Sequence, residues 1–175
     1  MTNLTREALV TDFSRWVASC AVRSNAPIRS RSAIYNALDA VDFAPLFKPE
    51  SGLIGSAEFG DWHKAAIARM QGAEPRLNVG WAAKILNEYL KTKCYIGGYG
   101  RDGLPEVIHP PIDNGLIVGL KSRFMDNPIP APQLSSLELM NSLDTYDKYE
   151  ALIRICGQVA EFTDCSLLES EQFWD

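Results

Sequence analysis

The chain of 175 residues has no long apolar run and few histidines and cysteines. No stretch approaches the roughly 20 apolar residues that a membrane-spanning helix needs. The amino-terminal segment MTNLTREALVTDF has neither the basic block nor the apolar block of a signal peptide. A soluble, cytoplasmic protein without a membrane partner is therefore expected, and a hydrophobic fraction of 46% predicts a single domain over residues 1–175.

Metal-binding patterns are also absent. The four cysteines are scattered, with no C-x-x-C pair, and only two histidines, His63 and His109, are available as further ligands. The cysteines are interpreted as reduced core residues. No metal and no cofactor are predicted.

Positive charge is scarce overall but unevenly distributed. Residues 138–175 contain nine acidic residues and two basic ones, Lys148 and Arg154, which gives this segment a net charge of −7. The whole chain has a net charge of −5. The remaining 15 basic and 13 acidic residues sum to +2, which permits a DNA-binding basic face there. Acidic carboxy-terminal helices are expected to pack on the rest.

Helical spacing of apolar residues dominates the chain, and we predict an all-α domain of seven or eight helices. The first is expected behind a Thr5 cap, with Leu9, Phe13 and Trp16 on one face. Others are expected from Ser32, from near Ser56, within 79–93, after Asp113, around 137–140 and over 146–162.

The clearest pattern is VGWAAKILNEYLKTK, whose apolar stripe leaves Lys84, Asn87, Glu88 and Lys91 on the opposite face. Lys84 should therefore point to solvent or into a cleft. It could pair with Glu88 at i+4, or serve as a nucleophilic amine if burial favoured the neutral form.

The segment CYIGGYGRDGLPEVIHPP, which follows, lacks helical spacing over some eighteen residues. Irregular stretches of this length are more often functional than simple connectors. Within it, Tyr99 has glycines on both sides, which allow a ligand to approach closely.

Asp113 lies in VIHPPIDNGLIVGL, between a tandem proline and an amphipathic helix. An Asp at this place caps the helix, which by itself contributes about 1 kcal/mol. Helix amides and the dipole would also hold the carboxylate ionised, ready to stabilise positive charge on a sugar. Capping and catalysis are compatible.

Two motifs are similar to those of the helix-hairpin-helix DNA glycosylases. In RLNVGWAAKILN, Leu77, Val79 and Gly80 precede a helix as the phosphate-binding hairpin of that superfamily does. PPIDNGL looks like its catalytic P-[VI]-D turn, and the order hairpin, helix, loop, turn, helix is the same. The resemblance covers about residues 75–124 and implies an all-α fold and cleavage of an N-glycosidic bond.

The match departs from the family in identifiable ways. Asn78 stands where a hairpin glycine is expected, and Ala82 stands where bifunctional members carry the Schiff-base lysine. Lys84 is two residues further, about 200° around a helix. The iron–sulfur cysteines are absent, whereas archaeal 8-oxoguanine glycosylases, and glycosylases that defend prokaryotes against phages, resemble the chain more.

The resemblance and the residue chemistry together select candidate site residues. Asp113, Lys84 and His109 are the catalytic candidates, with His109 as a proton donor to the leaving base. Tyr99, Tyr95 and Trp81 are candidates for stacking on a flipped base. Candidates for binding DNA phosphates are Asn78, Gly80, Lys91, Lys93, Arg101 and Arg123.

Other interpretations remain open for each of these residues and for the function. Asp113 could only cap, His109 could be structural, and Trp81 could be simple core. The chain could then be a non-catalytic helical interaction protein, related to toxin systems or phages, whose acidic tail binds a basic partner. A helical ribonuclease of the HEPN kind is disfavoured because no R-x4-6-H motif occurs.

Overall fold

The computed structural model describes residues 5–22, 26–127, 134, 137 and 139–175. Within this part the chain is all-α, without strands, and folds as a single domain. None of these helices is long and apolar enough to span a membrane. The α-helices are α1 (Arg6–Cys20), α2 (Arg31–Asp39), α3 (Ala44–Phe47), α4 (Ser56–Ala73), α5 (Val79–Leu90), α6 (Leu104–Val107), α7 (Asn114–Phe124) and α9 (Tyr146–Thr163).

The described residues also form four shorter elements. The π-helix η2 (Lys91–Ile96) continues α5, and the 3₁₀ turns are η1 (Pro49–Ser51), η3 (Met140–Ser142) and η4 (Leu168–Phe173). The sequence predicted an irregular segment after α5. This prediction was wrong in part, because the end of η2 and the whole of α6 lie within that segment. The helix predicted around 137–140 falls partly outside the described residues.

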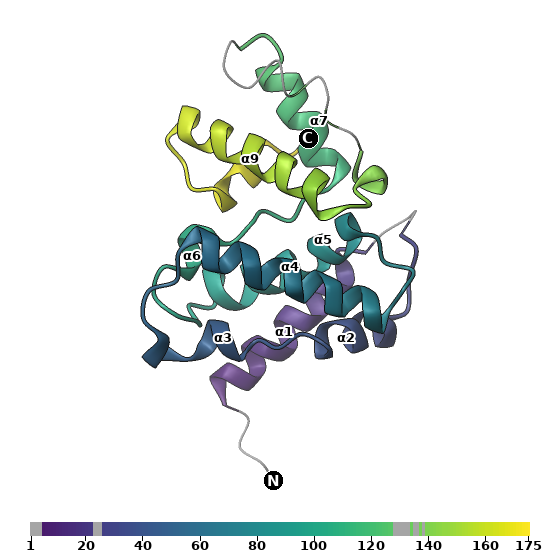
Figure 1. The fold of residues 1–175 in the computed structure, drawn as a ribbon, viewed down its shortest axis with the longest axis vertical. Helices are drawn as coiled ribbons and strands as arrows, with labels where there is room; N and C mark the ends of the chain where they lie inside the picture. The colour runs from purple at the N-terminus through teal and green to yellow at the C-terminus, as the bar shows by residue number, and fades with distance from the viewer. Residues whose placement is uncertain (1–4, 23–25, 128–133, 135–136, 138) are drawn as a thin grey trace.

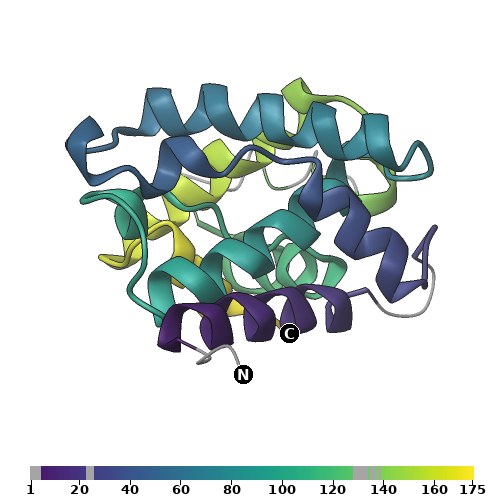
Figure 2. The same ribbon diagram turned by 90° about the horizontal axis from the view of Figure 1, so that it is seen from below.

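Helix α5 is the centre of the lower half of the molecule. Helices α1 and α4 lie on its two sides, as seen from below (Figure 2). Contacts from both sides bury nearly all of α5, including Lys84 and Asn87, which the amphipathic pattern placed on an outer face. The pattern predicted that Lys84 faces solvent or a cleft, and a solvent-facing position is wrong because α9, η3 and the Asp113 cap of α7 cover the remaining side.

Helix α1 begins behind the predicted Thr5 cap, whose side chain accepts the Ala8 amide hydrogen. Its larger apolar side chains face outward: Leu9, Phe13 and Trp16 are 53%, 55% and 46% exposed. The helix packs on α5 through its small residues, among them Ser14 and Ala18, which are fully buried. The predicted helix is confirmed, but its large apolar face is not part of the core.

The upper half contains α7, α9 and η4, which lie over the layer formed by α1 to α6 (Figure 1). The connection between the halves is residues 108–113, the Pro-Pro-Ile-Asp turn. Helix α9 matches the predicted range 146–162 closely and contributes Tyr149, Leu152 and Cys156 to the core. Two of the catalytic candidates, Lys84 and Asp113, meet at the junction of the two halves.

Candidate active site

Asp113 is the N-cap of α7, and its carboxylate has three donors. Oδ1 accepts the Leu116 amide hydrogen at 3.0 Å and the Trp174 indole Nε1–H at 2.8 Å. Oδ2 accepts from Lys84 Nζ at 3.1 Å. The predicted cap is thus confirmed, and the capping oxygen also contacts a residue 61 positions away in sequence.

Lys84 brings the opposite charge from the lower half to this contact. Its side chain, on α5, is 10% exposed and that of Asp113 is 22% exposed, so a narrow face of the pair meets solvent. Lys84 does not use Glu88, which pairs with Lys91 at 3.0 Å instead. The two catalytic candidates from different halves are therefore in direct contact.

Trp174 reaches Asp113 because α7 has glycines on the face that meets the carboxy-terminal segment. A Cβ at Gly115 would overlap the Trp174 indole, and one at Gly119 would overlap the Phe173 carbonyl oxygen. Phe173 packs edge-on against Phe124, with ring centroids 5.0 Å apart. The face of α7 that carries Gly115 and Gly119 therefore lets residues 173–175 pack closely against the helix, and we call this face the glycine seat.

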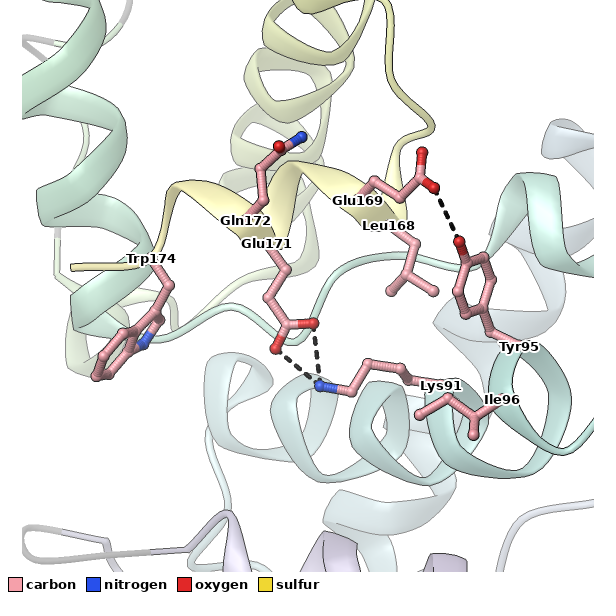
Figure 3. A pocket seen from close by; sticks show the side chains of 8 residues that line it. All are labelled: Lys91, Tyr95, Ile96, Leu168, Glu169, Glu171, Gln172 and Trp174. Carbon is pink, nitrogen blue, oxygen red and sulfur yellow. Dashed lines mark hydrogen bonds and ion pairs between the residues drawn. The ribbon is translucent and has the colours of Figure 1, made fainter.

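An open groove of about 810 Å³ lies next to this cluster, between η2 and η4 (Figure 3). Its lining residues are Lys91, Tyr95, Ile96, Leu168, Glu169, Glu171, Gln172 and Trp174. Lys91 donates to both Glu171 oxygens, at 2.7 and 3.0 Å, and Tyr95 donates to Glu169 at 2.9 Å. Burial raises the pKa of the Glu171 carboxyl above its ordinary value, although Lys91 opposes this.

His109 belongs to a buried polar network behind the site. Its Nδ1 is 3.0 Å from the Tyr149 hydroxyl, which accepts from Asn87 Nδ2, and the same amide donates to the Pro110 carbonyl. Asn87 Oδ1 lies 3.0 Å from His63 Nε2. Burial, with His63 nearby, holds the pKa of His109 well below its ordinary value.

This environment favours the structural interpretation of His109. A neutral imidazole with its Nδ1 turned to Tyr149 helps to hold the Pro-Pro-Ile-Asp turn against α5 and α9. The network therefore supports the position of Asp113 from behind, while Lys84 and Trp174 contact it directly.

Two phosphate-binding candidates have buried structural contacts. The Arg101 guanidinium donates to the carbonyls of residues 45, 51, 52 and 53 and pairs with Glu58, and the residue is 5% exposed. Lys93 is 7% exposed, with Nζ 4.2 Å from the centroid of Phe47. Neither can reach a phosphate in this conformation.

The hairpin candidates are also used within the fold. The Gly80 amide donates to the Leu143 carbonyl at 2.9 Å, and Asn78 caps α5 by accepting from the Trp81 amide. A phosphate at this helix start would have to displace η3. Of the remaining candidates, Lys91 lies in the groove and Arg123 is exposed on α7.

The three aromatic base-binding candidates lie in different places. Tyr95 lines the groove, whereas Tyr99 lies in a separate small pocket near Arg101. Trp81 is 6% exposed, and its indole donates to Asn141 at 3.1 Å. Of the three, Trp81 is the one recorded near the Lys84 and Asp113 cluster, with its ring centroid 5.9 Å from Lys84 Nζ, and Tyr95 is the one that lines the groove.

Sequence reasoning missed the contribution of residues 168–174 to the site. Glu171, Gln172 and Trp174 were counted only as part of the acidic carboxy-terminal segment, residues 138–175. One signal was present: Gly115 and Gly119, four residues apart on α7, mark a helix face that another segment approaches closely.

No group of three or more His, Cys, Asp or Glu side chains capable of holding a metal occurs among the described residues. Comparisons with protein-family models, curated proteins and solved structures found no significant match. A function for this chain therefore has to follow from the chemistry of the site itself.

Proposed function

We propose that this chain is a DNA glycosylase, which cleaves the N-glycosidic bond of a damaged or modified base and leaves an abasic site. The observation that carries the proposal is the 3.1 Å contact between Lys84 Nζ and Asp113 Oδ2 beside an open groove. A carboxylate fixed by three donors at a solvent-accessible junction suits the stabilisation of a cationic transition state.

The reaction assigns a separate task to Asp113. When the glycosidic bond breaks, its electron pair leaves with the base and C1′ becomes positively charged. The Asp113 carboxylate stabilises this charge and orients a water molecule, whose oxygen bonds to C1′ while its proton passes to solvent or to the base. The carboxylate is available for this because its donors fix its position.

Lys84 is placed to act as a cation or as a nucleophile. In its ion pair with Asp113 it is an ammonium ion, which has no lone pair to attack C1′. We therefore propose hydrolysis by water, without a Schiff base, and a monofunctional enzyme. His109, neutral and hydrogen-bonded behind the turn, is not given a role in proton transfer.

The groove gives a flipped base a place beside Asp113. Tyr95 and Trp174 provide aromatic surfaces, and the Lys91 and Glu171 pair provides donors and acceptors for a base edge (Figure 3). Enzymes that act on a base in duplex DNA must extrude it into such a site. The DNA partner is expected to be double-stranded, and Arg123 is the remaining candidate with an exposed side chain for a phosphate contact.

The test is formation of abasic sites, read with an aldehyde-reactive probe. Purified protein is incubated with plain genomic DNA, with hydroxymethylated or glucosylated phage DNA, and with duplexes that carry damaged bases. Asp113→Asn should abolish the signal with the fold retained, and Asp42→Asn, which alters another carboxylate that accepts a backbone amide, should not. Activity on phage DNA alone would assign the enzyme to phage defence.

Borohydride trapping decides between the two roles of Lys84. A covalent protein–DNA adduct that disappears in Lys84→Ala would make the enzyme bifunctional. Abasic sites without an adduct would support hydrolysis. No abasic sites on any of these DNAs would overturn the proposed function.

One observation favours a second candidate, a non-catalytic interaction protein. The exposed face of α1 carries Phe13 stacked on Trp16, with ring centroids 5.6 Å apart, and neither lies in the core. Apolar faces of this kind often mark interaction sites. Under this alternative Phe13→Ser would remove a partner from the purified complex, whereas Asp113→Asn would not.

A further inference from the structure

We infer that Trp174 is a positioning residue for Asp113, acting through its indole hydrogen bond from a seat on α7. The inference rests on the proposed function for its catalytic consequence. The contact itself, Trp174 Nε1–H to Asp113 Oδ1 at 2.8 Å, involves the oxygen that also caps the helix.

The hydrogen bonds leave the carboxylate with little freedom. The Leu116 amide alone holds one oxygen and would let the plane of the carboxylate rotate about its side-chain bond. Adding Trp174 on Oδ1 and Lys84 on Oδ2 gives donors from three different elements. Small misplacement of a catalytic group costs rate steeply, so the donor that defines this orientation matters for turnover.

The glycine seat fixes the position of the Trp174 indole through packing against α7. Gly115 lies directly beneath the indole, and Gly119 admits the Phe173 backbone, so both helix positions are open to the terminal segment. Phe173 is in turn anchored against Phe124. Trp174 itself is 55% exposed and is one of the residues that line the groove.

Trp174 therefore belongs to both the carboxylate cluster and the groove wall (Figure 3). A planar molecule that enters the groove meets the same indole that holds Asp113.

The kinetic test uses Trp174→Phe, which keeps a ring over Gly115 but removes the N–H donor. Single-turnover abasic-site formation at saturating DNA should slow about 10-fold or more, with little change in DNA affinity. Trp62→Phe is the matched control, because Trp62 also donates through its indole, to the Asp42 carbonyl, away from the site. An unchanged rate in Trp174→Phe would overturn the inference, and so would a faster rate, since the indole would then obstruct Asp113.

A second measurement does not depend on catalysis. In ¹⁵N-labelled protein, the indole N–H resonance that disappears in Trp174→Phe belongs to Trp174. It should shift strongly in Asp113→Ala and stay in place in Asp126→Ala, an exposed aspartate beyond the end of α7. If no DNA yields abasic sites, the proposed function fails, and this resonance alone decides whether Trp174 holds Asp113. No response to Asp113→Ala would overturn the inference.

Discussion

Lys84 and Asp113 lie 29 positions apart in sequence, on helices from the two halves of the molecule, and form an ion pair of 3.1 Å. The pair is partly shielded from water, which strengthens it relative to the pairs on the surface. It joins α5, the most buried helix, to the first turn of α7. The ion pair of Lys84 and Asp113 therefore belongs to the proposed site and also holds the two halves of the molecule together.

The energetic side of this pair is measurable with a double-mutant cycle. Lys84→Met and Asp113→Ala should each destabilise the protein by about 1–3 kcal/mol, and the double variant should cost less than their sum, because each single change leaves an unpaired charge. Chemical denaturation of the four proteins gives the coupling energy. The exposed pair of Arg69 and Asp42, with atoms 3.9 Å apart, is the control and should show a smaller coupling. Equal couplings would contradict the view that the site pair is shielded.

The glycine seat predicts a second effect on stability. Gly119→Ala should destabilise the fold by about 1–3 kcal/mol, because the added methyl group meets the Phe173 carbonyl and residues 173–175 must move. Gly157→Ala on α9 is the matched control, since its Cβ would meet nothing within 4 Å. That control should stabilise by about 0.5–1 kcal/mol through the lower entropy of the unfolded chain. Thermal unfolding of both variants would show opposite shifts, and a neutral Gly119→Ala would show that the segment is not seated there.

The fold class could be predicted because the signals that carry it are local. Apolar spacing, the Thr5 cap and the Asp113 cap predicted α1, α7 and α9 from short stretches of sequence. Burial failed where it depends on distant segments. Leu9, Phe13 and Trp16 have core-like spacing but face solvent, because α1 packs through Ser14 and Ala18.

In the site, too, features with a local signal could be predicted and contacts between distant segments could not. Asp113 could be found from its turn, and Lys84 from the polar face of α5, because each has a local context. That Lys84 contacts Asp113 depends on how the halves pack, which no local pattern encodes. Trp174 reaches the site from 61 positions away, and Arg101 was taken for a phosphate ligand because a buried arginine and a surface arginine look alike in sequence.

The two arginines can be separated by experiment. Arg101→Met should destabilise the protein by about 1–3 kcal/mol, because buried carbonyls of residues 45 and 51–53 lose their donor. Its affinity for DNA below the unfolding temperature should not change. Arg123→Met should leave stability nearly unchanged. If α7 faces DNA, this change should also reduce the slope of log K for DNA binding against log salt concentration by about 1. Fluorescence anisotropy over a salt series measures this, and a weaker complex with Arg101→Met alone would reverse the assignment.

The buried histidines predict how stability depends on pH. Burial lowers the pKa of His63 to about 4, although a hydrogen bond with Asn87 opposes this, and the neighbouring groups are His109, Tyr146 and Tyr149. Between pH 6.5 and about 4 the unfolded chain binds a proton that the folded chain does not. The contribution of a neutral His63 is therefore fully present above its ordinary pKa and is lost as the pH falls through this range, by about 3 kcal/mol in all. His109, whose pKa is also lowered by burial, adds a loss of the same sign.

His63→Gln isolates this effect, because glutamine can still donate to Asn87 but does not titrate. Urea unfolding at about pH 7 and about pH 5 should show wild-type protein losing more stability than His63→Gln over that interval. The carboxylates titrate in both proteins and cancel in the comparison. His109→Gln is the companion variant and should also flatten the pH dependence. Parallel losses in wild type and His63→Gln would mean that His63 accepts a proton in the folded state as readily as in the unfolded chain, which would contradict its burial against Phe59 and Tyr149.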